Sequence, residues 1–205
     1  AFRKFVSATI RQEDALKHLE TRLKSTNNAV GISATEIRKY AAELQKATTL
    51  GDVEIIEMQN VLLTFTNVTG EQFKRATEAI LNTSVALGQD LKSSALQVGK
   101  ALNDPIANLG ALGRAGIQFS DAQQEVIKSL AETGRIAEAQ KIILSELDVQ
   151  MGNSARAARD TFGGALKSLG NTFSDLFEGD SSSTGEAITA LHNLERTLSS
   201  PAMQQ

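Results

Sequence analysis

Apolar residues recur along most of the chain at spacings of three and four positions, which is the period of an amphipathic helix. Leu16, Leu19 and Leu23 show this spacing near the beginning. The period-two alternation of a strand is nearly absent. Its best candidate, "NVLLTFTNVT", overlaps "VEIIEMQN", which has helical spacing. The pattern therefore predicts an all-α fold.

Polar residues and glycines separate these apolar segments and predict where the helices begin and end. A Ser or Thr followed three positions later by Glu or Gln is a capping box, and three such pairs occur: Ser33 with Glu36, Thr69 with Gln72, and Ser120 with Gln123. Asp90 and Ser154 are further predicted N-caps. The segments between these signals have uneven lengths and share no side-chain signature, so we predict a bundle of short capped helices and no repeat protein.

The pattern also predicts how the chain is organised. We expect an N-terminal helix at residues 1–29 that continues a longer chain, and a compact helical domain at 30–153. A near-heptad series predicts a longer amphipathic helix at 154–178. The acidic, Ser-rich stretch at 179–185 is typical of a linker, and a terminal helix is expected at 186–205. The near-heptad series is a predicted self-association or packing seam, formed by Ala158, Phe162, Ala165, Leu169, Phe173 and Leu176.

One stretch, "NDPIANLGALGRAGIQFSDAQQ", interrupts the helical pattern with a proline and three glycines. A dinucleotide-binding turn would need G-x-G-x-x-G after a strand, and a P-loop would need a Lys followed by Ser or Thr, and neither condition is met. We therefore predict a structural turn at Pro105, Gly110, Gly113 and Gly116. Its apolar side chains are expected to point inward: Ile106, Leu109, Leu112, Ile117 and Phe119.

Composition and charge exclude several classes of function. The net charge of −3 provides no global basic field for nucleic acid. Cysteine is absent, which excludes disulfides and thiolate metal sites and is compatible with a reducing compartment. His18 and His192 are far apart and are expected at the surface. We predict no catalytic, cofactor-binding or metal site, hence no enzyme and no specific small-molecule ligand. No apolar run approaches the roughly 20 residues that span a bilayer.

The segment from about residue 50 to 178 resembles the phage tail length tape measure proteins of long non-contractile tails and prophages. The resemblance rests on four steps in order: "LNDP", "LGALGRAGIQFSDAQ", "IKSLAETGRIAEAQKIIL" and "ARAARDTFGGALKSLGNTF". The first 50 residues resemble the family only through their pattern of short helices. None of the steps is a catalytic motif, so the specificity of the resemblance lies in their order and combined length.

The resemblance implies a structural virion protein that sets tail length inside the tail tube and leaves during DNA delivery. Its implied partners are the tail tube protein, tail assembly chaperones and copies of itself, with genome DNA involved only indirectly and the host envelope met on ejection. Its implied location is the virion tail lumen, and the host cytoplasm during assembly. Two alternatives stay open: a stand-alone helical interaction module, adaptor or chaperone-like, and a membrane-active effector that uses the Phe–Leu stripe.

Overall fold

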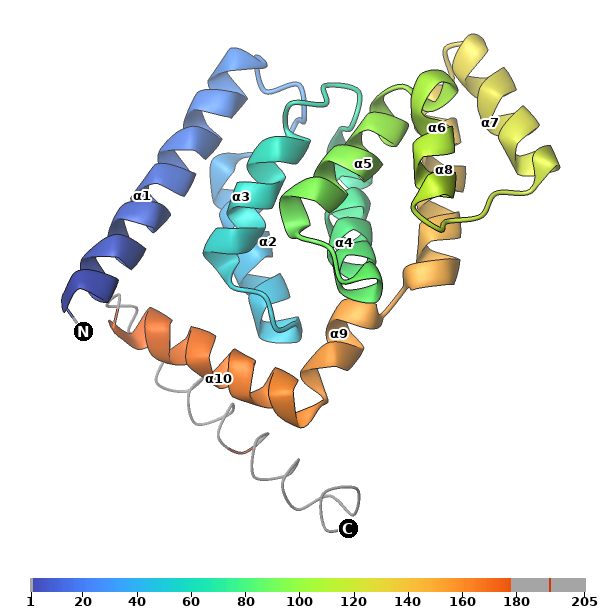
Figure 1. Cartoon of the computed structure of the whole chain (residues 1–205). Helices are drawn as coiled ribbons and strands as arrows, with labels where there is room; N and C mark the ends of the chain where they lie inside the picture. Colours follow the sequence, from blue (N-terminus) through green and yellow to red (C-terminus); the bar gives the residue numbers. More distant parts are fainter. Residues whose placement is uncertain (1, 178–191, 193–205) are drawn as a thin grey trace, which may run out of the picture.

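Helices follow one another through the described part of the chain, which comprises residues 2–177 and residue 192 of the computed structural model (Figure 1). Within these residues no strand occurs, so the predicted all-α fold is confirmed. The helices are Phe2–Ser25 (α1), Ala34–Ala47 (α2), Asp52–Leu62 (α3), Gly70–Leu87 (α4), Leu91–Asn103 (α5), Pro105–Arg114 (α6), Asp121–Glu132 (α7), Ile136–Met151 (α8), Ser154–Arg159 (α9) and Phe162–Phe177 (α10).

Two of the predicted capping boxes are confirmed. At the start of α2, the backbone N–H of Glu36 donates to Ser33 Oγ at 3.2 Å, and the N–H of Ser33 donates to Glu36 Oε2 at 3.0 Å. Ser120 and Gln123 make the same reciprocal pair at the start of α7. Each box satisfies two backbone donors that a helix start would otherwise leave unpaired. Asp90 also caps α5 as predicted, because its side chain accepts the N–H of Ser93.

Two other cap predictions are wrong. Thr69 is the N-cap of α4, but its side chain makes no capping hydrogen bond. The next residue, Gly70, has a φ of +53° and donates its N–H to the carbonyl of Val30 at 2.8 Å, so a contact with a distant loop shapes this helix start. Ser154 is the first residue of α9 and not its cap, since its hydroxyl donates back to the carbonyl of Met151.

Helix α3 lies at the centre of the first half of the molecule. It packs against α1, α2 and α5, while α4 packs against α5, α8 and α9. Their buried faces form one continuous hydrophobic core, whose largest fully buried side chains include Leu19, Ile37, Ile55, Met58, Phe73, Ile80, Leu102, Leu112, Ile117 and Ile127. Because Ala15 and Leu19 of α1 belong to this core, the N-terminal helix is packed on the region predicted as the compact domain.

The single helix predicted over 154–178 is wrong, because the chain bends between α9 and α10 at Asp160 and Thr161. The Thr161 hydroxyl donates to the carbonyl of Ala158 at 2.9 Å and accepts the N–H of Gly164 at 3.0 Å. Beyond the bend, Asn171 donates its side-chain N–H to the carbonyl of Thr49, and this bond ties α10 to the loop between α2 and α3. The predicted linker at 179–185 and terminal helix at 186–205 lie outside the described residues, except for His192, which is exposed.

Candidate functional site

The stretch predicted as a structural turn contains a helix followed by a turn. Pro105 is the first residue of α6, where its missing N–H costs nothing, and the side chain of Asp104 caps that helix. Gly110 and Gly113 lie inside α6, so they are not turn residues. The turn comes after the helix at Gly116, whose φ of +102° favours glycine.

The apolar side chains of this stretch point inward with one exception. Leu112 and Ile117 are fully buried, and Leu109 and Phe119 pack partly buried against the core. Ile106 is 54% exposed, so its predicted burial is wrong. Pro105 takes the inward position instead, and with Leu109 and Leu112 it forms the i, i+4, i+7 ridge that faces the core. Ile106 lies one position round the helix from that ridge.

The residues of the predicted seam are divided between two helices. Ala158 lies half-buried on α9, while Ala165 is buried and Leu169 partly buried on α10. Phe162, Phe173 and Leu176 are part of the α10 backbone, and their side chains lie outside what the structure describes. Since Ala165 and Thr172 are buried and α10 is bonded to Thr49, part of this helix is packed within the chain.

Sequence reasoning missed a groove that α1, α3 and α5 enclose. Its volume is about 920 Å³. The lining residues are Ile10, Arg11, Asp14, Ala15, His18 and Arg22 from α1, Glu57, Asn60 and Val61 from α3, Thr64 just after it, and Lys92 and Leu96 from α5. The groove combines exposed apolar side chains with charged ones, which is the composition of a recognition surface.

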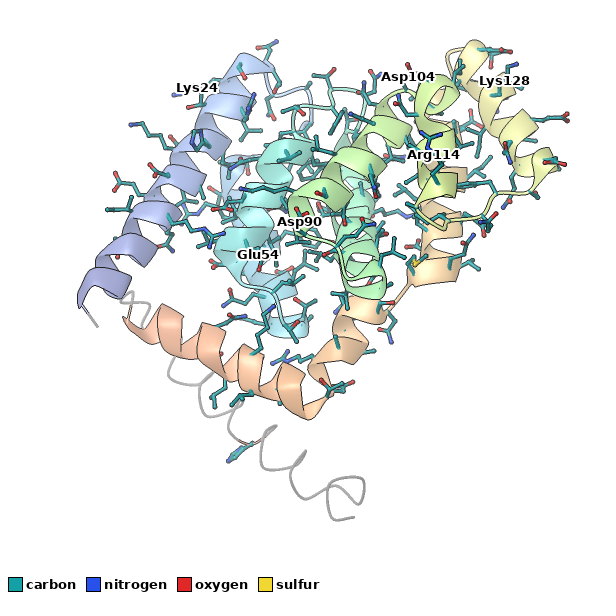
Figure 2. The ribbon with its side chains drawn as sticks, in the orientation of Figure 1. Lys24, Glu54, Asp90, Asp104, Arg114 and Lys128 are labelled. Atoms are coloured by element: carbon teal, nitrogen blue, oxygen red, sulfur yellow. The ribbon has the colours of Figure 1, made fainter. Side chains whose placement is uncertain are left out.

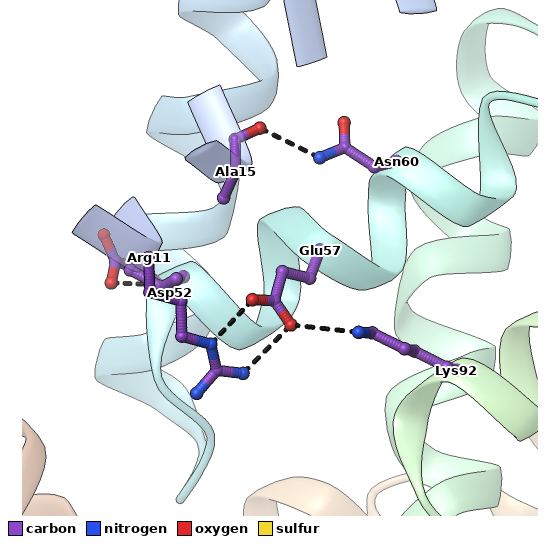
Figure 3. Close-up of polar contacts among 7 residues, drawn as sticks. Arg11, Ala15, Asp52, Glu57, Asn60 and Lys92 are labelled. Atoms are coloured by element: carbon purple, nitrogen blue, oxygen red, sulfur yellow. Dashed lines mark hydrogen bonds and ion pairs between the residues drawn. The ribbon is translucent and has the colours of Figure 1, made fainter. Parts of the chain in front are cut away.

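A shared carboxylate joins the three helices in this groove (Figure 3). Glu57 accepts two hydrogen bonds from Arg11, at 2.6 Å from Nε and 2.9 Å from Nη2. Lys92 Nζ lies 3.4 Å from the Oε2 atom of the same carboxylate. The hydrogen bond from Arg11 lowers the pKa of Glu57 and raises that of the Arg11 guanidinium, although burial opposes both shifts. Glu57 thus stays ionised and compensates one of two neighbouring cations.

Asn60 fastens the floor of the groove to its α1 wall. Its Nδ2 donates to the backbone carbonyl of Ala15 at 2.9 Å, across two helices that are far apart in sequence (Figure 3). The side chain is only 9% exposed, and its Oδ1 has no hydrogen-bond partner among the described residues. This hydrogen bond adds to the packing of α1 on α3.

A signal for part of this groove is present in the sequence. Glu57, Asn60, Val61 and Thr64 follow the i, i+3, i+4, i+7 spacing, and three of these four positions are polar within a largely apolar segment. The walls could not be inferred in the same way, because they depend on which helices pack on either side of α3. The sequence alone contains no signal for that choice.

A second polar cluster lies between α2, α4 and α9. The Tyr40 hydroxyl donates to Glu78 Oε1 at 2.7 Å, and Arg156 Nη2 lies 3.7 Å from Glu78 Oε2. Burial raises the pKa of Tyr40, and the bond to Glu78 adds to this effect. The cluster therefore links three helices through one hydrogen bond and one ion pair, and we assign it a packing role.

In the part of the chain that the structure describes, no group of three or more His, Cys, Asp or Glu side chains is placed to hold a metal ion. None of the described helices is both long and apolar enough to cross a membrane. His18 is exposed at the groove and His192 is exposed as well, as predicted.

No family model, curated protein or solved structure matches the chain.

Proposed function

We propose that the chain is part of a phage tail tape measure protein, which lies inside the tail tube, sets tail length and is released during DNA delivery. The observation that carries the proposal is the order of four sequence steps between about residues 50 and 178 that resemble this family. The implied partners are the tail tube protein, the tail assembly chaperones and other copies of the chain.

The places of these steps in the fold are compatible with a structural role. "LNDP" holds the end of α5 and the cap of α6, with Asp104 bonded to the N–H of Ala107. The second step contains the Gly116 turn and the capping box of α7. Gln140 of the third step is 1% exposed and donates to the carbonyls of Asn67 and Leu102 at 2.8 and 3.0 Å.

The last step follows the same rule. Thr161 and Gly164 shape the bend before α10, and Asn171 fastens α10 to Thr49. All of these residues end helices or join them. A segment whose characteristic residues serve packing suits a protein that acts through its shape and length.

Two measurements on the encoding phage or prophage test the proposal. Mass spectrometry of purified tails is expected to detect peptides from residues 2–177. A tandem duplication of residues 2–177 is expected to lengthen the tail, because the proposed protein sets tail length through its own length. One unchanged copy remains in the duplicated protein, so that assembly is still supported. The increase would be roughly 260 Å for extended helix at 1.5 Å per residue, and roughly 40 Å for a compact body of this size. Tails that lack the peptides, or that assemble at unchanged length with the duplicated protein inside, would refute the proposal.

A further inference from the structure

The groove between α1, α3 and α5 has the shape of a trough for a helix. Its floor consists of Glu57, Asn60, Val61 and Thr64, which follow one face of α3 and the residues just after it. Its longest wall runs along α1 from Ile10 to Arg22, which is about 18 Å at the helical rise per residue. An open trough of this length accommodates about three turns of helix, a recurrent mode of recognition between proteins.

Apolar side chains on both walls of the trough are exposed. Ile10 on α1 is 53% exposed and Leu96 on α5 is 45% exposed, and both line the groove together with the partly buried Val61. Large apolar side chains that share a groove rimmed by polar residues mark an interaction surface.

The trough carries a small excess of formal positive charge although the whole chain is negative. Its lining holds the cations Arg11, Arg22 and Lys92 and the carboxylates Asp14 and Glu57, which is three cations against two anions when His18 is left out of the count. The chain as a whole has a net charge of −3. Two of the cations share the single carboxylate of Glu57, and Arg22 makes no ion pair with any described residue. The trough therefore favours an acidic occupant.

Helix α7 provides a surface of matching length and opposite charge. It lies at the far side of the molecule from α1 (Figure 1), and its 12 residues span about 18 Å. Val126 on this helix is 48% exposed. Ile106 of α6, 54% exposed, lines a small hollow together with Glu125 of α7.

The charges of α7 complement those of the trough. The helix carries three carboxylates, Asp121, Glu125 and Glu132, and one cation, Lys128, which is labelled in Figure 2. The Nζ atom of Lys128 lies 3.8 Å from Glu132 Oε1. Asp121 and Glu125 form no ion pair with any other described residue, and both are exposed. Two free carboxylates on an exposed helix thus match a trough with an excess cation.

We propose that α7 of one copy of the chain docks in the α1–α3–α5 trough of a second copy. The two surfaces differ and lie at opposite sides of the molecule, so each copy offers one of each and the contact is head-to-tail. Such a contact continues from copy to copy into an open chain or closes as a ring. One helix in a trough buries a small area, so the association is weak and sensitive to salt. The proposal does not rest on the function proposed above.

Complementary variants of the purified chain test the contact. Lys92→Glu with Leu96→Glu blocks the trough, and Glu125→Lys with Val126→Lys blocks α7. All four side chains are exposed, so both variants are expected to fold, and circular dichroism and thermal melting check this. Analytical ultracentrifugation is expected to show that the unsubstituted chain self-associates beyond a dimer at high concentration, and that each variant alone associates at least tenfold more weakly.

A mixture of the two variants tests whether α7 of one copy binds the trough of another. The α7-blocked variant retains its trough and the trough-blocked variant retains its α7, so the mixture is expected to form a one-to-one dimer and nothing larger. That dimer is expected to weaken as salt rises. Three results would overturn the proposal: an unsubstituted chain that stays monomeric up to about 1 mM, where only contacts weaker than about −4 kcal/mol escape detection; variants that associate like the unsubstituted chain; or a mixture that does not dimerise.

Discussion

Gly99 in α5 is expected to be intolerant of alanine, although alanine normally strengthens a helix. A Cβ built on Gly99 would lie 2.3 Å from Cε2 and 2.4 Å from Cδ2 of Phe65, in the loop that follows α3. Such distances are far below van der Waals contact, so the Phe65 ring would have to move by more than 1 Å, roughly, out of its place against the core. Gly99 is buried, and the neighbouring α5 residues Val98 and Ala101 are core residues, so little space is free nearby.

The magnitude follows from two opposing contributions. Replacing glycine by alanine inside a helix stabilises it by about 1 kcal/mol. Overpacking a filled site costs typically about 1–3 kcal/mol. The difference lowers the free energy of unfolding of Gly99→Ala by up to about 2 kcal/mol. Gly113→Ala is the matched control, because Gly113 lies inside α6, is exposed, and a Cβ there meets no atom within 4 Å. It is expected to be neutral or stabilising by up to about 1 kcal/mol.

Urea unfolding followed by circular dichroism measures both variants. A double-mutant cycle with Phe65→Ala identifies the cause, because removal of the ring leaves room for the new methyl group. In the Phe65→Ala background, Gly99→Ala is expected to become neutral or stabilising. If Gly99→Ala is as stable as Gly113→Ala, or if its cost persists without the ring, then Phe65 does not determine the need for glycine and the reasoning fails.

Two further predictions concern buried polar groups and pH. Gln140→Met is expected to destabilise by about 1–3 kcal/mol, since it leaves two carbonyls without their donor. Gln59→Met is its control and is expected to be neutral or stabilising, because the fully buried Gln59 amide has no partner among the described residues; equal losses in urea unfolding would contradict this. The pKa of Glu57 is lowered in the folded state, so its stabilisation is present above its ordinary pKa and is lost as the pH falls through the folded value. Between pH 7 and pH 3 the free energy of unfolding is expected to fall less for Glu57→Gln than for the unsubstituted chain, with a difference below about 1 kcal/mol. Equal falls in the two proteins, measured by urea unfolding at each pH, would exclude the effect.

The features that the sequence predicted correctly are those whose causes lie within a few residues. The boxes at Ser33 and Ser120 formed because both partners of each lie within four positions. The box at Thr69 did not form, because the helix start there depends on Val30, some 40 positions earlier. Apolar periodicity likewise indicates that a helix has a buried face. In α6 it did not determine which of the adjacent residues Pro105 and Ile106 belongs to that face, and the burial predicted for Ile106 is wrong.

The candidate site was missed for the same physical reason. A groove exists where packed helices leave a space, and its walls are set by contacts such as Asn60 with Ala15, 45 positions apart. Ile10 and Leu96 follow the apolar pattern of their helices, and only the packing shows that both stay exposed. The bend at Asp160 was also hidden, because a near-heptad series continues through it without interruption.

The bend between α9 and α10 bears on whether residues 154–177 serve as a rod. A Cβ built on Gly164 would lie 1.9 Å from the carbonyl oxygen of Ala158, so the bent backbone requires glycine at this position. A straight helix has no such requirement and would gain about 1 kcal/mol from alanine. Straightening would also break the bond from Asn171 to Thr49 and expose Ala165. A rod is therefore reached only at the cost of these contacts.

Gly164→Ala is accordingly expected to open the bend, while Gly163→Ala, where a Cβ meets no atom within 4 Å, is expected to leave it closed. The chain has no native cysteine, so spin labels can be attached at two exposed positions through Glu43→Cys on α2 and Lys167→Cys on α10. Double electron–electron resonance then measures the separation of the two helices. We expect a longer and broader distance distribution for Gly164→Ala than for Gly163→Ala. Identical distributions would show that α10 is held by its contacts with the domain and that the glycine at the bend does not control its position.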